Sequence, residues 1–149
     1  MNKELENAIN DYFTGDAKEN ALDFTAFLSA NDILLESNGD GRGWAVGGIV
    51  GNSNGFLMID TAGGRLAIWI NNCDFPGGDS ADDDLKAFAW AHVVNCPQEP
   101  CVGGGCAEKH HRNVIFGREY DSTCHSPLAF FEPDAETLEG IKKLFLLLS

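Results

Sequence analysis

The apolar residues near the start of the chain recur at helical spacing. One stripe within residues 3–13 predicts a first helix, which Gly15 would end, and its members are Leu5, Ala8, Ile9, Tyr12 and Phe13. A second helix is predicted over residues 16–30, with the Asp16 carboxylate capping its free amides and Glu19 as the partner of that cap. Its inner face would carry Phe24, Phe27 and Leu28.

The pattern changes in the next part of the chain. A turn at residues 37–41 follows the short apolar run 33–35, because Gly and Asn tolerate the positive φ that turns require. Three apolar runs then occupy residues 44–50, 56–61 and 65–71, with Gly-rich breaks between them. This arrangement is typical of an antiparallel β-meander. Since the runs are nearly continuous in apolar residues, we expect both faces of the sheet to be partly covered.

The second half of the chain returns to helical spacing. Ser80 and Asp83 form a capping-box pattern, which predicts a third helix with a body from Leu85 to Val94 and an end at Pro97. Short strands are predicted at 113–116 and 128–131. A last helix starts near Pro133, and its apolar face would hold Leu138, Ile141, Leu144, Phe145 and Leu148.

Helices kept apart from consecutive strands predict an α+β fold, with helices packed against an antiparallel meander. The chain has 149 residues, 44% of them hydrophobic, and no Pro- or Ser-rich linker divides it. That length and composition fit one domain over residues 1–149, with enough chain to bury a core.

Charge and hydropathy narrow the classes of partner. The formal net charge of −13 argues against nucleic acid, because a phosphate backbone would be repelled. No apolar run approaches the roughly 20 residues of a membrane span, and the N-terminus lacks the apolar core of a signal peptide. We therefore expect a cytoplasmic protein that binds no membrane. In that compartment, five cysteines are expected to be thiols or metal ligands rather than disulfides.

Candidate chemistry concentrates in a Cys/His-rich loop segment, residues 96–125. It holds four of the five cysteines and three of the four histidines, and it is nearly neutral while the rest of the chain is acidic. Thiolate and imidazole are the ligands that zinc prefers, in tetrahedral sets of four. The predicted metal ligands are Cys96, Cys101, Cys106 and Cys124, and His110, His111 or His125 can each replace one of them.

Other interpretations of the same segment stay open. The two x4 gaps between Cys96, Cys101 and Cys106 are at the loose end of zinc-ligand spacing, which favours a surface loop of reduced cysteines. A redox-active or nucleophilic thiol is a further alternative. His92 is better explained as a core histidine hydrogen-bonded to a neighbour than as a ligand.

The last third of the chain resembles a family of small bacterial proteins for which no activity is known. The shared features are a Cys-rich loop, the pattern Phe116-Gly117-Arg118-Glu119-Tyr120-x-x-x-Cys124, and a helix of the form P-D-A-E-x-L-E-x-I-K-K-L that begins at Pro133. The cysteines of this chain are more widely spaced than those of the family. The resemblance implies that the Cys-rich loop and the FGREY segment form a recurring unit.

These observations lead to three hypotheses about function. The first is a small binding or accessory domain, whose Cys/His loop is either plain or stabilised by a structural metal such as zinc. The second is a thiol-dependent redox protein or enzyme that uses a cysteine of residues 96–124. The third is a small-molecule-binding domain, in which the aromatic residues of the meander line a pocket.

Overall fold

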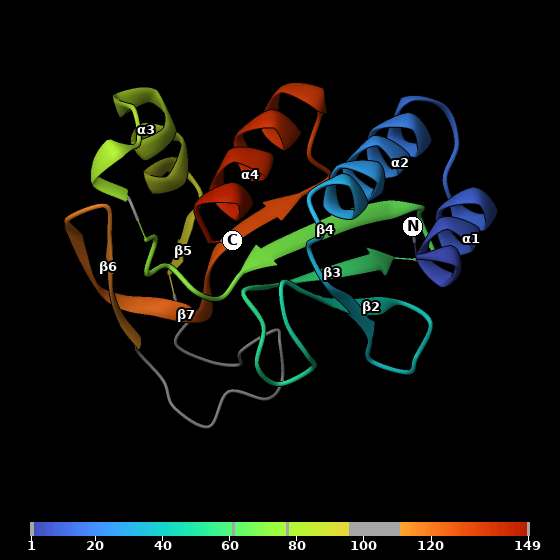
Figure 1. Cartoon of the computed structure of the whole chain (residues 1–149), viewed down its shortest axis with the longest axis horizontal. Coiled ribbons are helices and arrows are strands. Elements are labelled where there is room, and N and C mark those ends of the chain that lie inside the picture. The colour runs from blue at the N-terminus through green and yellow to red at the C-terminus, as the bar shows by residue number, and fades with distance from the viewer. Residues whose placement is uncertain (1, 61, 77, 96–110, 149) are drawn as a thin grey trace.

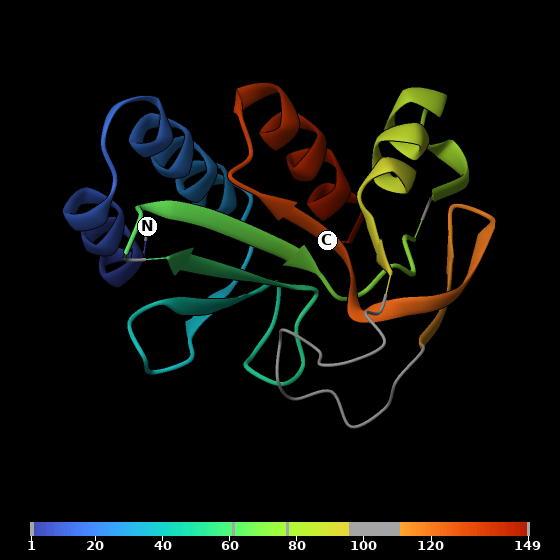
Figure 2. The same cartoon turned by 180° about the vertical axis from the view of Figure 1, so that it is seen from behind.

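The computed structural model describes residues 2–60, 62–76, 78–95 and 111–148. Four helices lie in a row over one face of a twisted antiparallel sheet (Figure 1). The same two layers are seen from behind in Figure 2. The predicted α+β class, with helices packed against a meander, is confirmed.

The helices of the described chain follow the predicted order. They are α1 (Lys3–Tyr12), α2 (Gly15–Ala30), α3 (Asp83–Ala91) and α4 (Ala135–Leu148), and a 3₁₀ turn η1 (Gly78–Ser80) precedes α3. Among the described residues, no helix combines the length and the apolar composition that crossing a bilayer requires.

The sheet has seven strands in the described chain, and all of its pairs are antiparallel. The strands are β1 (Leu35–Ser37), β2 (Gly43–Val46), β3 (Gly55–Asp60), β4 (Arg65–Ile70), β5 (Val93–Asn95), β6 (His111–Ile115) and β7 (Arg118–Phe131). Their spatial order is β1-β2-β3-β4-β7-β5, and β6 also pairs with β7. The predicted meander therefore forms β2, β3 and β4, and the long β7 joins it to the C-terminal half of the chain.

Two predicted helix caps are wrong. Helix α2 begins at Gly15, and its N-cap residue Thr14 makes no side-chain capping bond, so Asp16 lies inside the first turn. Helix α3 is capped by Asp82, whose Oδ1 accepts a hydrogen bond from the Leu85 amide at 2.7 Å. Ser80 cannot take that place because it belongs to η1, and Asp82 has the extended backbone that an N-cap needs.

Three predicted element boundaries also differ from the structure. Helix α3 ends at Ala91, and Val93 pairs with Leu128 of β7, where a β-branched side chain is better accommodated than in a helix. Strand β2 stops at Val46 because the chain turns at Gly47, which has φ of +74°. Strand β7 extends far upstream of residue 128, because a tight turn at Phe116-Gly117, both with positive φ, folds it onto β6.

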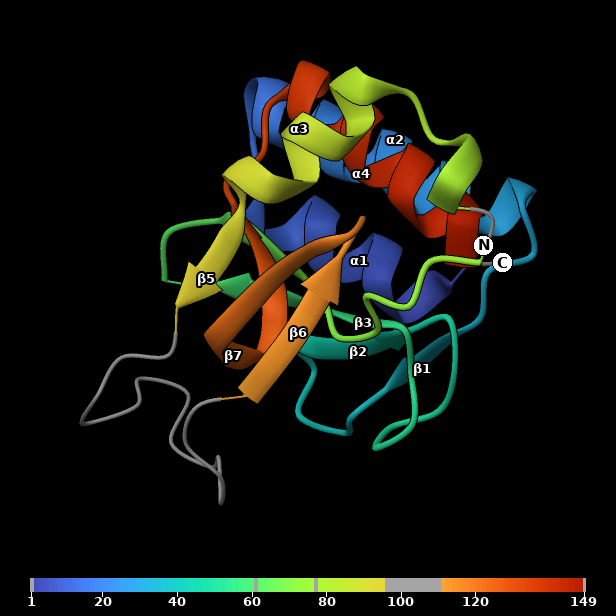
Figure 3. The ribbon, with the colours of Figure 1, turned by 90° about the vertical axis from the view of Figure 1, so that its left-hand side faces the viewer.

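The core lies between the helices and the sheet face that they cover. Figure 3 shows this helical layer above the sheet, with the hairpin of β6 and β7 beneath α3. The expected inner residues of α4 are buried, namely Leu138, Ile141, Leu144 and Phe145. They pack in one cluster with alternate strand residues such as Leu57, Ile59, Ile68 and Ile70. Strand alternation then sends the residues in between to the opposite face.

Candidate functional site

Large apolar side chains occupy the sheet face that the helices leave uncovered, which we call the helix-free face. Phe56 and Met58 of β3, Trp69 of β4 and Phe131 of β7 lie there, because each alternates with a residue that packs into the core. Phe131 is 65% exposed and Met58 is 40% exposed. The described helices all lie on the other face, but Ala45 and Ala129 on the helix-free face are only 1% and 6% exposed, so both faces are partly covered, as expected.

The three aromatic rings form a continuous row across three neighbouring strands. The ring centroids of Phe56 and Trp69 are 6.5 Å apart, with planes tilted by 50°. Trp69 meets Phe131 edge to face at 5.7 Å and 87°. Edge-to-face contact is a favoured geometry for aromatic pairs, so the rings hold one another in fixed orientations on the sheet.

Small residues alternate with the large ones on the helix-free face. Ala45 pairs with Phe56, Ala129 with Trp69, and Ala67 with both Met58 and Phe131. Gly43 leaves room for a ring, because a Cβ built on it would lie 2.5 Å from Cζ of Phe56. The larger side chains cover these small residues, since Ala45 is 1% exposed and Ala129 is 6% exposed.

Polar groups lie at the margins of this face. The Arg65 guanidinium donates to the Asp60 carboxylate at 2.6 Å where the β3–β4 hairpin ends. That hydrogen bond holds the pKa of Asp60 below its usual range. Glu36, on the edge strand β1, pairs with Ala45 and so faces the same way. The apolar residues at the centre of the face are thus bordered by polar ones, and the charges of Asp60 and Arg65 neutralise each other.

The predicted metal ligands lie largely outside the described residues. Cys96, Cys101, Cys106 and His110 fall within residues 96–110, and of His111, Cys124 and His125 the structure describes the backbone alone, in β6 and β7. Among the described side chains, no three His, Cys, Asp or Glu residues are placed to hold a metal ion.

The sheet brings both ends of that segment to one point on β7. Asn95, the last residue of β5, pairs with Thr123, and His111, the first residue of β6, pairs with Thr123 as well. Cys124 follows directly in the sequence. The described residues on either side of 96–110, Asn95 and His111, therefore both lie beside the residue that precedes Cys124.

His92 has the structural role expected from the sequence. Its Nδ1 lies 2.8 Å from the carbonyl oxygen of Phe88. Its ring contacts those of Phe88 and Phe130, each centroid 4.7 Å away, and these two rings also stack on each other. This half-buried histidine joins the end of α3 to β7.

A cavity of about 340 Å³ lies between η1, α3 and the β6–β7 hairpin. Cys73 lines it, together with Lys86 and the stacked rings of Phe75 and Phe116, whose centroids are 4.7 Å apart. Cys73 is a free, buried cysteine, and burial raises the pKa of its thiol to about 12. The thiolate, which is the nucleophilic form, is therefore suppressed at neutral pH.

We expect Cys73 of the folded protein to resist alkylation by iodoacetamide at pH 7. A rise in pKa from 9.0 to about 12 lowers the thiolate fraction by roughly a thousandfold. Mass spectrometry of the Cys73 peptide, with and without denaturant, measures the effect. Equal labelling rates in the two conditions would show that the thiol is accessible and reactive.

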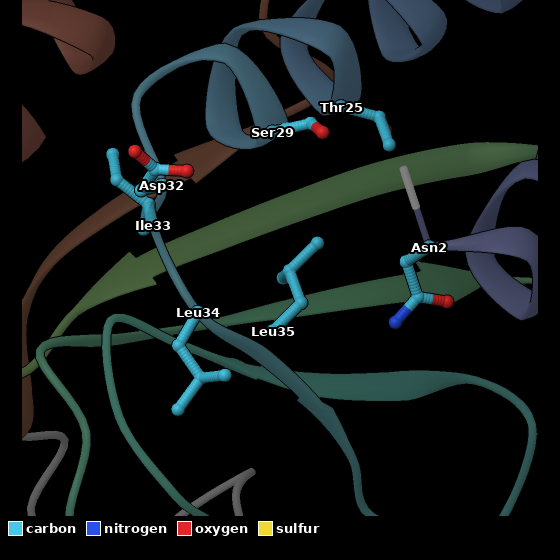
Figure 4. Close-up of a pocket in the computed structure, with 7 residues that line it drawn as sticks. All are labelled: Asn2, Thr25, Ser29, Asp32, Ile33, Leu34 and Leu35. Atoms are coloured by element: carbon cyan, nitrogen blue, oxygen red, sulfur yellow. The ribbon is translucent and has the colours of Figure 1, made fainter.

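A second cavity, of about 320 Å³, lies below the C-terminal end of α2 (Figure 4). Two of its polar side chains already serve the helices. Asn2 Oδ1 accepts a hydrogen bond from the Leu5 amide, and Thr25 Oγ1 donates to the Ala21 carbonyl. The remaining lining residues are Ser29, Asp32, Ile33, Leu34 and Leu35. The helix-free face is the stronger candidate site, because its Phe131 is 65% exposed and contacts the ring of Trp69.

No family model, curated protein or solved structure matches the chain. The candidate site therefore depends on the geometry of this molecule alone.

Proposed function

We propose that the protein is a small cytoplasmic binding or accessory domain whose helix-free face binds a partner protein. The observation that carries the proposal is the row of Phe56, Trp69 and Phe131 on that face, with Met58 beside it. Phe131 and Met58 are exposed, and Phe56 and Trp69 are half-buried. Large apolar side chains that are exposed next to one another mark interaction sites.

The composition of the face supports a protein partner. Aromatic residues and methionine are enriched at the centres of protein interfaces, and polar residues form their rims. Here Glu36 and the Asp60–Arg65 pair occupy the margin. A nucleic acid is a poor partner for a chain with a net charge of −13, since its phosphates would be repelled.

Photo-crosslinking from the face tests this proposal. A chain with p-benzoylphenylalanine in place of Phe131, produced in its native host, should form a covalent adduct with another protein chain. The matched control places the same group at Leu146, which is 45% exposed on α4. The adduct should also disappear when Trp69→Ser is added to the chain labelled at 131. No adduct from position 131, or equal adducts from both positions, would contradict the proposal.

A structural zinc ion is the second candidate, with Cys96, Cys101, Cys106 and Cys124 as ligands and His110, His111 or His125 as replacements. The pairing of both Asn95 and His111 with Thr123 supports it, because the ligand-bearing segment starts and ends beside Cys124. Binding such an ion would contribute folding free energy, since the unfolded chain has no preformed site.

Metal analysis of untagged protein tests the zinc site. We expect about one zinc ion per chain for a closed four-ligand site, and Cys124→Ser should lower that ratio. Cys73→Ser is the matched control, because Cys73 is a buried free cysteine outside the predicted ligand set and should leave the ratio unchanged. A metal-free protein with rapidly alkylated thiols in residues 96–124 would favour a thiol-dependent redox protein or enzyme instead.

A further inference from the structure

We propose that Asn38, in the turn between β1 and β2, is a site of spontaneous deamidation, and that Ser37 and Glu4 assist the reaction. The Gly39 backbone nitrogen attacks Cγ of Asn38. The N–Cγ bond forms, the Cγ–Nδ2 bond breaks, and the proton of the Gly39 amide leaves with the departing ammonia. Water then opens the succinimide ring at either carbonyl, which gives aspartate or isoaspartate. The site does not depend on the proposed function, since none of its evidence involves a partner.

The attacking nitrogen belongs to a residue with open space around it. Gly39 is exposed and has φ of +92°, and a Cβ built on it would meet no atom within 4 Å. Asn38 is exposed as well. Because glycine has no side chain and adopts conformations that other residues do not, the five-membered ring has room to close in this turn.

The side-chain carbonyl of Asn38 is polarised for attack. Its Oδ1 accepts a hydrogen bond from the Asp40 backbone amide at 3.1 Å. When a nitrogen attacks Cγ, negative charge develops on Oδ1, and a backbone N–H that already points at this oxygen stabilises the charge. The structure therefore supplies one electrostatic contribution to the reaction before it starts.

A hydrogen-bond relay leads away from the attacking nitrogen. The Gly39 amide donates to Oγ of Ser37 at 3.1 Å, and the Ser37 hydroxyl donates to Oε1 of Glu4 at 3.3 Å. Gly39 has to lose its amide proton as the new bond to Cγ forms. Ser37 can accept that proton while it passes its own to the Glu4 carboxylate, which thus acts as a general base through the hydroxyl.

The chain contains a second Ser-Asn-Gly sequence, which the fold protects. Gly55 is buried in β3, and a Cβ there would lie 2.5 Å from the carbonyl oxygen of Trp69. Nδ2 of Asn54 donates to the Leu148 carbonyl at 3.4 Å, and Ser53 Oγ donates to the Gly55 carbonyl at 2.8 Å instead of facing its amide. Ring closure at Asn54 would have to disrupt the sheet, so this site is an internal control.

Deamidation at Asn38 would change the turn and the margin of the helix-free face. Nδ2 of Asn38 now donates to Oδ2 of Asp40 at 3.2 Å, and the product would place a second carboxylate there. A Cβ on Gly43 would lie 2.6 Å from this Nδ2 and 2.5 Å from Cζ of Phe56, so the two side chains are neighbours. The new charge would therefore lie beside the aromatic row. Isoaspartate would also lengthen the main chain between β1 and β2 by one atom.

Mass spectrometry of peptides from the folded protein, incubated at neutral pH, tests the site. The Asn38 peptide should deamidate at least about tenfold faster than the Asn54 peptide, because Asn54 can react only in the small fraction of molecules that are locally unfolded. In urea the two rates should become similar, since the local sequences match. Equal rates in the folded protein, or no deamidation at Asn38, would overturn the proposal.

Ser37→Ala and Glu4→Gln test the relay separately. Each should slow deamidation of Asn38 in the folded protein at least about tenfold, as expected when a positioned general base is lost. Neither should change the rate in urea, where the relay is absent. Glu4 is exposed and Ser37 is half-buried, so both variants should fold, which circular dichroism verifies. Unchanged or faster deamidation in both folded variants would overturn the part assigned to Ser37 and Glu4.

Discussion

Replacing Ile141 with alanine should lower the free energy of unfolding by about 2–5 kcal/mol, the range for large-to-small changes in a filled core. Ile141 is completely buried on the inner face of α4, in one cluster with Leu138, Leu144 and Phe145. Phe145 in turn lies 6.2 Å from the ring of Phe24 in α2. The change therefore leaves a cavity where α4 meets the core, and urea unfolding measures its cost.

Leu146→Ala provides the matched control. Leu146 is in the same helix but is 45% exposed, so its truncation should change stability by no more than about 0.5 kcal/mol. Both substitutions introduce alanine within α4, so the change in helix propensity contributes little to the difference in stability between the two variants. Equal losses in the two variants would show that the inner face of α4 has been misassigned.

The local sequence patterns predicted which helices and strands form better than they predicted the residues at which these begin and end. The apolar faces of α1 and α4 are confirmed except at Tyr12, which is 47% exposed, because a stripe at helical spacing has to meet a core. The start of α3 was misplaced because Ser80, Asp82 and Asp83 all qualify chemically as caps. The choice between them depends on backbone conformation, since η1 ends before Asp82 becomes extended.

The helix-free face could not be read from the sequence, although its residues were visible there. Residues 56–61 and 65–71 are almost wholly apolar, so alternation alone does not say which side chains the helices cover. The row appears only when the register pairs Phe56 with Trp69 and places Phe131 opposite Ala67. Such pairings between distant segments depend on the tertiary fold. The predicted metal ligands, in contrast, cluster in sequence, and both ends of their segment meet at Thr123.

Replacing Gly64 with alanine should destabilise the protein by about 2–5 kcal/mol, for two reasons that add. Gly64 has φ of +61°, a conformation that costs a residue with a Cβ about 1–2 kcal/mol. In addition, a Cβ there would lie 2.3 Å from the carbonyl oxygen of Tyr12, at the end of α1. A backbone carbonyl cannot move aside as easily as the end of a flexible side chain. Overpacking of this kind therefore lowers the stability by about 1–3 kcal/mol more. The turn between β3 and β4 therefore not only connects the two strands but also packs against the end of α1.

Gly41→Ala separates the two contributions to that loss. Gly41 lies in the turn between β1 and β2 with φ of +75°, and a Cβ there would meet no atom within 4 Å. Its loss should thus be the conformational part alone, about 1–2 kcal/mol. The excess loss in Gly64→Ala over Gly41→Ala, measured by urea unfolding, reports the contact with α1. If the two variants lose the same amount, the hairpin does not bear on α1, and the close approach at Tyr12 plays no part in holding the first helix to the sheet.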